Sequence, residues 1–174
     1  MGVSMGKEAT NIVSKEGVRV HILIDELNKL YCDEWLAYIQ YIEVAQVASG
    51  LPRQSLVAEL EEHAAEELDH MKKIAKRIIE LGGTPVIEPK AWYKYSGCGY
   101  EAPEDPDSRV ILQQNLRSER CAINAYNRLI KILAGRDPVT NKMLVKILQE
   151  EVEHEQDLED IETDMKSLSY HKKK

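Results

Sequence analysis

The chain of 174 residues contains no phenylalanine, and aromatic residues make up only 6% of it. This scarcity, beside abundant Leu, Ile, Ala, Glu and Lys, favours helices. Long apolar runs are also missing. None approaches the roughly 18 residues of a membrane span, and the N-terminal stretch MGVSMGKEATNIVSKEG has no apolar core of the secretory type. We therefore expect no membrane segment and a cytoplasmic location.

The sequence also contains few cysteines and fewer basic than acidic residues. The three cysteines, Cys32, Cys98 and Cys121, are too few for a disulfide scaffold, and their odd number leaves at least one thiol unpaired within the chain. The formal net charge is −7, which argues against a dedicated nucleic-acid binder and suits a protein that handles cations. The Lys-rich end HKKK is interpreted as a solvated tail, so DNA binding is not expected.

Proline and glycine gather at a few positions and divide the chain into four long helical segments. The sequences SGLP, GGTP and GRDP mark helix ends within a single expected domain. Short turns make neighbouring helices antiparallel, and one long link lets the second pair start from the opposite end. This pattern predicts an all-α antiparallel four-helix bundle with one long crossover, between frayed N- and C-terminal tails. The expected helices span residues 15–48, 53–81, 108–134 and 138–168, and the crossover spans 82–107.

One short motif, Glu-x-x-His, occurs twice, as Glu67 with His70 and as Glu151 with His154. Each pair lies in the middle of a stripe of apolar residues that repeats every three or four positions. Such stripes face the core of a helical bundle. Both pairs are therefore expected inside the bundle.

The other two helices each carry one glutamate on a similar stripe, Glu34 and Glu119, followed seven residues later by Tyr41 and Tyr126. The step to the glutamate of the Glu-x-x-His pair is 33 residues in the first half of the chain and 32 in the second. Two helical hairpins thus carry the same chemistry at the same depth, which indicates a site with twofold pseudosymmetry. The tyrosines are candidate catalytic residues that support the site or transfer electrons. Core packing is the alternative role.

Four glutamates in an apolar core would be very unfavourable as bare anions, because a buried carboxylate without compensation takes up a proton instead. Two divalent cations cancel four negative charges, and the i, i+3 spacing lets both side chains of each pair reach the same ion. Di-iron and di-manganese carboxylate bundles have this pattern. Carboxylate and imidazole ligands suit iron, manganese or zinc. The predicted metal ligands are Glu34, Glu67, His70, Glu119, Glu151 and His154.

These residues resemble the ferritin-like superfamily, and bacterioferritin in particular. The resemblance covers all four helices and rests on the stretches EWLAYIQY, EELDHMKKIAKRIIELGGTP and EEVEHEQDLEDIE. It implies a ferritin-like bundle with two Fe ions per chain, Mn or Zn being possible. At such a centre Fe(II) is oxidised by hydrogen peroxide or oxygen and stored as a ferric mineral.

Three differences from other ferritin-like groups indicate which group the chain resembles most. Ala122 stands where rubrerythrins have a glutamate, and no CxxC pair is present. The helix expected over 15–48 has no methionine to bind haem, so haem is not expected. Little sequence follows residue 168 for the short fifth helix of 24-subunit cages. The chain therefore resembles the Dps-like thioferritin group, which implies a homododecameric cage that protects against oxidative stress.

The cysteines have two interpretations. Cys98 lies in the expected crossover, and Cys121 lies two residues after Glu119. From spacing alone, the two are an incidental loop thiol and a small packing residue. The resemblance to thioferritins implies instead a redox-active pair beside the metal site. Cys32 is interpreted as core filler.

Two further features of these helices have open roles. His63 shares the helical face of Glu67 and is either a hydrogen-bonded core histidine or a neighbour of the site that relays iron. Apolar residues off the core stripe, such as Trp35, Ile39 and Ile42, indicate a subunit interface.

Three functions are compatible with the sequence. The first is an iron-oxidising mini-ferritin that consumes peroxide and stores iron. The second is a di-manganese catalase or peroxidase without storage, and the third is a metal-free helical assembly protein. Iron and manganese accept the same ligands, so the sequence does not separate the first two.

Overall fold

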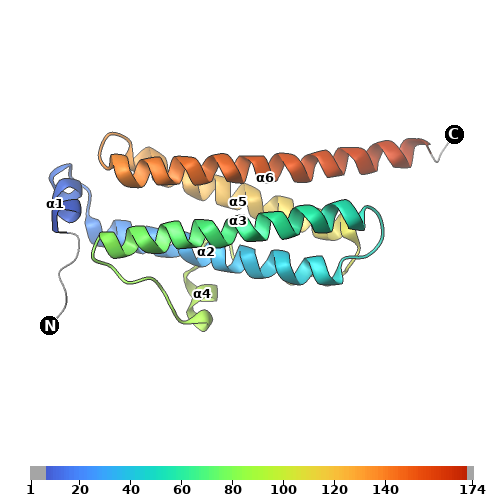
Figure 1. The fold of residues 1–174 in the computed structure, drawn as a ribbon, viewed down its shortest axis with the longest axis horizontal. Helices are drawn as coiled ribbons and strands as arrows, with labels where there is room; N and C mark the ends of the chain where they lie inside the picture. Colours follow the sequence, from blue (N-terminus) through green and yellow to red (C-terminus); the bar gives the residue numbers. More distant parts are fainter. Residues whose placement is uncertain (1–6, 172–174) are drawn as a thin grey trace.

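The computed structural model describes residues 7–171, with side chains up to residue 167, and this part of the chain forms six helices and no strand (Figure 1). No helix within the described range is long and apolar enough to cross a membrane. The three lysines at the C-terminus, expected to be a solvated tail, lie outside the described residues. The helices are α1 (Lys7–Lys15), α2 (Val20–Val47), α3 (Arg53–Glu80), α4 (Pro89–Tyr95), α5 (Ser108–Leu133) and α6 (Pro138–His171).

The four long helices form the expected bundle. Helices α2 and α3 make one antiparallel hairpin, α5 and α6 make the other, and the chain between α3 and α5 crosses the side of the bundle (Figure 1). Two apolar clusters fill the interior. One contains Leu27 and Ile74 with their neighbours, and the other contains Leu60 and Leu158. On α3, α5 and α6, the predicted metal ligands fall between residues of one cluster and residues of the other. On α2, Glu34 lies near the end of the first cluster, before the second begins at Tyr41. A polar layer thus divides the apolar core.

The N-terminal segment differs from the sequence-based expectation of a frayed tail. Residues 7–15 form α1, and the expected long helix begins at residue 20 rather than 15. Gly17 separates the two helices with a φ of +75°, a conformation that glycine adopts without steric cost. Val13 is buried, and the Thr10 hydroxyl donates a hydrogen bond to the carbonyl of Leu81 at 3.4 Å. These contacts with the core and the end of α3 explain why α1 is ordered.

The crossover also contains more structure than its sequence indicated. The short helix α4 places Trp92 against Trp35 of α2, with stacked rings 4.5 Å apart. The indole N–H of Trp92 donates to the carbonyl of Val86 at 2.7 Å, and Asn28 of α2 accepts from the amide of Val86 at 2.9 Å. Trp35, which we expected at a subunit interface, is therefore covered by the chain's own crossover.

A second anchor holds the end of the crossover on α2. The buried carboxylate of Asp33 accepts hydrogen bonds from the amides of Gly97 at 2.8 Å and Cys98 at 2.9 Å, and from the hydroxyl of Ser96. Burial raises the pKa of Asp33 to about 6. The amide of Glu101 donates to the side chain of Gln40 at 3.0 Å. The loop that carries Cys98 is thus fixed against the bundle.

Candidate metal centre

The structure brings the six predicted ligands together in the polar layer of the bundle. Each of the four long helices contributes at least one of these residues, and each of the six side chains is 2% exposed or less. Their donor atoms form two groups, and within each group all the donor atoms lie within 4.8 Å of one another. Glu67 and Glu151 belong to both groups, as carboxylates that bridge two ions would. The groups are Glu34, Glu67, His70 and Glu151, and Glu67, Glu119, Glu151 and His154.

Distances around the two histidines show the twofold arrangement. Nδ1 of His70 lies 3.0 Å from Glu67, 3.1 Å from Glu151 and 3.3 Å from Glu34. Nδ1 of His154 lies 3.4 Å from Glu67, 3.8 Å from Glu119 and 3.9 Å from Glu151. Each Nδ1 therefore faces three carboxylates, one from its own helix and two from other helices.

The outer nitrogens of the two histidines contact glutamates that the sequence did not single out for this role. Nε2 of His70 lies 2.9 Å from Glu150 of α6, and Nε2 of His154 lies 2.9 Å from Glu66 of α3. An N–H group at each Nε2 donates to the carboxylate, which would leave Nδ1 available to bind a cation. In the sequence, a glutamate immediately precedes the Glu of each Glu-x-x-His pair, and this could have indicated Glu66 and Glu150. That each of them contacts the histidine of the other helix depends on the tertiary structure.

Without cations the charges of the centre must be balanced by protons. Burial, followed by repulsion from Glu67, raises the pKa of Glu34 to about 8. Burial and repulsion from Glu34 raise the pKa of Glu151 well above its usual value. Burial alone would lower the pKa of His154, but the nearby carboxylates of Glu119 and Glu67 outweigh it and raise the pKa to about 12. The centre holds protons that divalent cations would displace.

Several buried donor atoms of the centre lack a hydrogen bond, which supports the fit of these residues to metal ions. Glu34 Oε2, Glu151 Oε1 and His154 Nδ1 are buried, face the centre and form no hydrogen bond within the protein. Buried polar atoms of this kind are rare unless a ligand satisfies them. The donor set of carboxylates and imidazoles suits iron, manganese or zinc.

The two tyrosines have different surroundings despite their matched spacing. The hydroxyl of Tyr126 donates a hydrogen bond to Glu34, and burial together with nearby carboxylates raises its pKa well above the usual value. The hydroxyl of Tyr41 is buried and has no hydrogen-bond partner within the protein, and its ring lies edge-on to His63 at 5.8 Å. Tyr126 is therefore tied directly to a predicted ligand, whereas Tyr41 is not.

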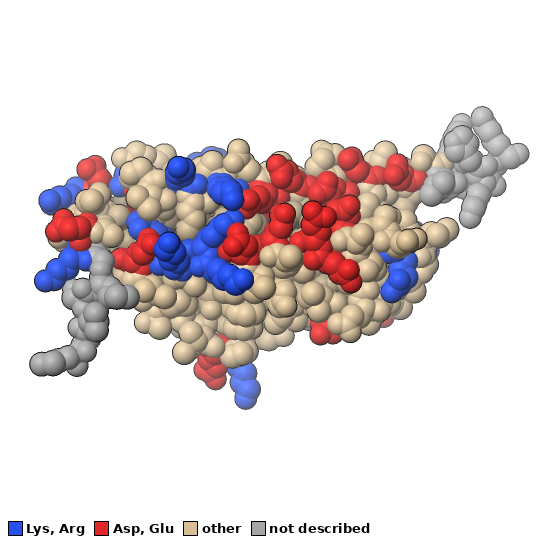
Figure 2. All heavy atoms as spheres, in the orientation of Figure 1, with Lys and Arg blue, Asp and Glu red and all other residues tan. Residues whose placement is uncertain are grey.

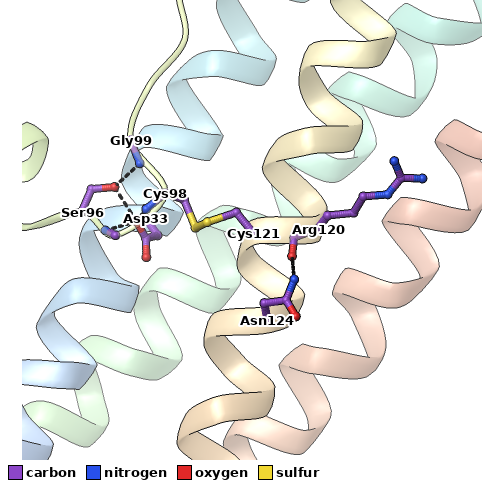
Figure 3. Close-up of a disulfide and its surroundings, with 8 residues drawn as sticks. Asp33, Ser96, Cys98, Gly99, Arg120, Cys121 and Asn124 are labelled. Atoms are coloured by element: carbon purple, nitrogen blue, oxygen red, sulfur yellow. Dashed lines mark hydrogen bonds between the residues drawn. A yellow bond between two sulfur atoms is a disulfide. The ribbon is translucent and has the colours of Figure 1, made fainter.

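The crossover brings the two cysteines together. Cys98 and Cys121 form a disulfide with their Cα atoms 5.8 Å apart, which joins the loop held by Asp33 to α5 (Figure 3). Cys98 also lines a small cavity of about 10 Å³ beside Glu34 and Glu119. Cys32 is a free, buried thiol whose pKa is raised to about 12, mainly by burial.

His63 completes the surroundings of the centre. Its ring stacks on the ring of His154 with centroids 4.0 Å apart. Burial, with a smaller effect of His154, lowers its pKa to about 3, so the ring is neutral. Neither ring nitrogen forms a hydrogen bond within the protein. His63 is therefore not the hydrogen-bonded core histidine that was one of its two expected roles.

Comparison with known proteins identifies the family. Residues 24–168 match the ferritin-like domain family, and the chain belongs to that family. The expected ferritin-like fold is thereby confirmed.

Individual relatives are also similar over most of the chain. The bacterioferritin-related protein of Bacteroides fragilis, described as a dodecameric thioferritin, has a TM-score of 0.92 and 44% identity over 95% of this chain and 98% of its own. The DNA protection during starvation protein of Pyrococcus furiosus is 29% identical over 160 residues, which are 91% of this chain and 86% of that protein. The bacterioferritin of Desulfovibrio desulfuricans is 28% identical over 147 residues, which are 84% of this chain and 77% of that protein. The resemblance to the Dps-like thioferritin group is confirmed.

Proposed function

We propose that this chain is a Dps-like mini-ferritin. It oxidises Fe(II) with hydrogen peroxide or oxygen at a centre inside each subunit and stores the ferric product in a dodecameric cage. The main support is the sharing of Glu67 and Glu151 between two groups of donor atoms, which suits two cations bridged by two carboxylates. The proposed ligands are Glu34, Glu67, His70, Glu119, Glu151 and His154.

The chain's residues would prepare the centre for its substrate, Fe(II). Four carboxylates balance the charge of two divalent cations, while Glu150 and Glu66 hold the two histidine rings with Nδ1 directed inward. The hydrogen bond from Tyr126 orients Glu34. Two Fe(II) ions supply the two electrons that reduce one hydrogen peroxide to two waters, with the uptake of two protons.

The position of the cysteine pair beside the centre suits a second source of electrons for the iron ions. Cys98 lines the small cavity that also contains proposed ligands. When a dithiol there closes to the Cys98–Cys121 disulfide, it releases two electrons and two protons, which suffices to return two ferric ions to Fe(II). Under this proposal the pair resets the centre without fresh iron, and an external thiol reductant reopens the disulfide. Disulfides inside cells commonly have such catalytic or sensing roles.

The assembly and storage roles are tested together by the mass of the particle and its iron content. The purified protein would be loaded with Fe(II) and peroxide, separated by size, and analysed by light scattering and elemental counting. We expect a particle of twelve times the 19.9 kDa chain mass that holds far more than two irons per chain. A stable monomer would exclude storage in a cage. A dodecamer with no more than two metals per chain would favour the manganese catalase alternative.

A further inference from the structure

A group of acidic side chains covers the face formed by α3 and α6, in the central part of Figure 2. His63 lies beneath this face, 2% exposed. Its Nε2 is 3.5 Å from Asp157 Oδ2 and 3.9 Å from Glu59 Oε2. The two carboxylates are on different helices and are 49% and 36% exposed. Two partly exposed carboxylates therefore lie beside a buried imidazole.

The donor atoms of these three residues are spaced as they would be around one cation. All three lie within 4.8 Å of one another, and neither nitrogen of His63 is hydrogen-bonded within the protein. A cation with bonds of about 2.1 Å holds its ligand atoms roughly 3.0–3.4 Å apart, so small side-chain movements would close the site. Burial, and after it repulsion from Asp157 and Glu62, raises the pKa of Glu59. A cation would relieve the repulsion.

His63 also belongs to a second, inner group. Donor atoms of His63, Glu119 and His154 lie within 4.8 Å of one another, and all three residues are buried. The imidazole of His63 thus belongs both to a group with two solvent-facing carboxylates and to a group with two proposed ligands of the centre. No other described residue is shared in this way between an exposed group and the buried donor groups.

We propose that Glu59, His63 and Asp157 form a third cation site, which holds a divalent transition-metal ion as it passes between the acidic face and the buried centre. The identity of the ion as Fe(II) rests on the proposed function, whereas the site itself does not. Imidazole with two carboxylates suits Fe(II), Mn(II) and Zn(II) alike. Zn(II) is a suitable probe because it undergoes no redox chemistry.

The test counts zinc in the assembled, metal-free full-length protein after titration with Zn(II) and removal of unbound ion. We expect three Zn(II) per chain in the wild type and two in Asp157→Asn. This exposed substitution keeps the side-chain shape and so does not threaten folding. Asp164→Asn, which removes the same charge from an exposed position further along α6, should keep three. Anomalous diffraction should place the third ion within about 2.3 Å of His63 Nε2.

Other outcomes separate this proposal from the proposed function. Two zinc ions per chain at the Glu67–Glu151 centre, with no ion at His63, would overturn the third site and leave the centre intact. Zinc at His63 but not between Glu67 and Glu151 would support the third site and overturn the di-metal centre. Three ions in Asp157→Asn would remove Asp157 from the site.

A kinetic measurement adds a second readout. If the third site feeds the centre, Asp157→Asn should raise the KM for Fe(II) in the oxidation reaction by about tenfold, as loss of a metal-site contact commonly does. Its kcat and its di-metal occupancy at saturation should match those of Asp164→Asn. An unchanged KM would show that cations reach the centre by another path.

Discussion

Glu66 and Glu150 each contact the histidine of the opposite hairpin. Glu66 of α3 holds His154 of α6, and Glu150 of α6 holds His70 of α3. Glu150 also accepts from Lys73 at 3.2 Å, and its pKa is lowered to about 2 because hydrogen bonds from Lys146, His70 and Lys73 outweigh the effect of burial. A carboxylate so firmly ionised is a strong acceptor for the imidazole N–H.

Substitution of a carboxylate shared by both donor groups should sharply reduce the proposed oxidation of Fe(II) without unfolding the bundle. Glu67→Gln keeps the size of the side chain but removes a charge shared by both donor groups. We expect the rate of Fe(II) oxidation to fall by more than about 100-fold, beyond the losses typical of residues that only orient ligands. The change also relieves buried repulsion in the metal-free chain, so the far-ultraviolet circular dichroism should stay the same. Turnover equal to that of the wild type would remove Glu67 from the centre.

Loss of an orienting carboxylate should have a smaller effect. Glu150→Gln weakens the hydrogen bond that sets the ring of His70, so we expect a loss of about 10–100-fold in metal affinity. The exposed neighbour Glu153 provides a matched control, since Glu153→Gln removes the same charge from the same helix. Competition with a chelating dye would measure the affinities. Equal affinities for the two variants would mean that Glu150 acts only through its charge.

Among the structural elements, the crossover is the one whose structure could be predicted least completely from the sequence. Its prolines and glycines correctly predicted an irregular connection, but α4 and the two anchors on α2 depend on tertiary contacts. Stacking of Trp92 on Trp35 and the three hydrogen bonds accepted by Asp33 are not encoded in any local period. By contrast, the long helices and the spacing of the predicted ligands follow from the 3.6-residue repeat, which is local information. Helix α1 was missed because it is ordered by Val13 and Thr10.

The disulfide between the crossover and α5 makes a specific kinetic prediction. Cys98→Ser, and equally Cys121→Ser, should retain metal binding but lose peroxide consumption driven by a dithiol when iron is limiting, because the two electrons of the pair are no longer available. Peroxide loss followed with a dithiol reductant would measure this. Cys32→Ala, which leaves the disulfide in place, is the control. If both serine variants consume peroxide as fast as the control, the disulfide has only a structural role.

For the whole molecule, proton binding in the centre sets the pH dependence of stability. The raised pKa of Glu34, about 8, means that the folded metal-free chain holds this proton more tightly than the unfolded chain. The resulting stability is full below the unfolded pKa of about 4.5 and is lost as the pH rises through about 8. His154, with its pKa raised to about 12, acts in the same direction above about pH 6.5.

We therefore expect the metal-free protein to unfold at a lower temperature near pH 9 than near pH 6. Thermal unfolding after treatment with a chelator would measure the difference. Glu34→Gln should reduce it, because the amide does not titrate. Saturation with Zn(II) should also reduce it, since the cations replace the protons. A melting temperature that rises between these two pH values would contradict the charge balance described for the centre.

The contacts of Glu66 with His154 and of Glu150 with His70 make the two hairpins depend on each other. Each hairpin supplies the carboxylate that orients the other hairpin's histidine, and each cation group takes residues from both hairpins. Neither half of the chain therefore contains all the residues of either donor group. A single hairpin produced alone should therefore lack both four-residue donor groups.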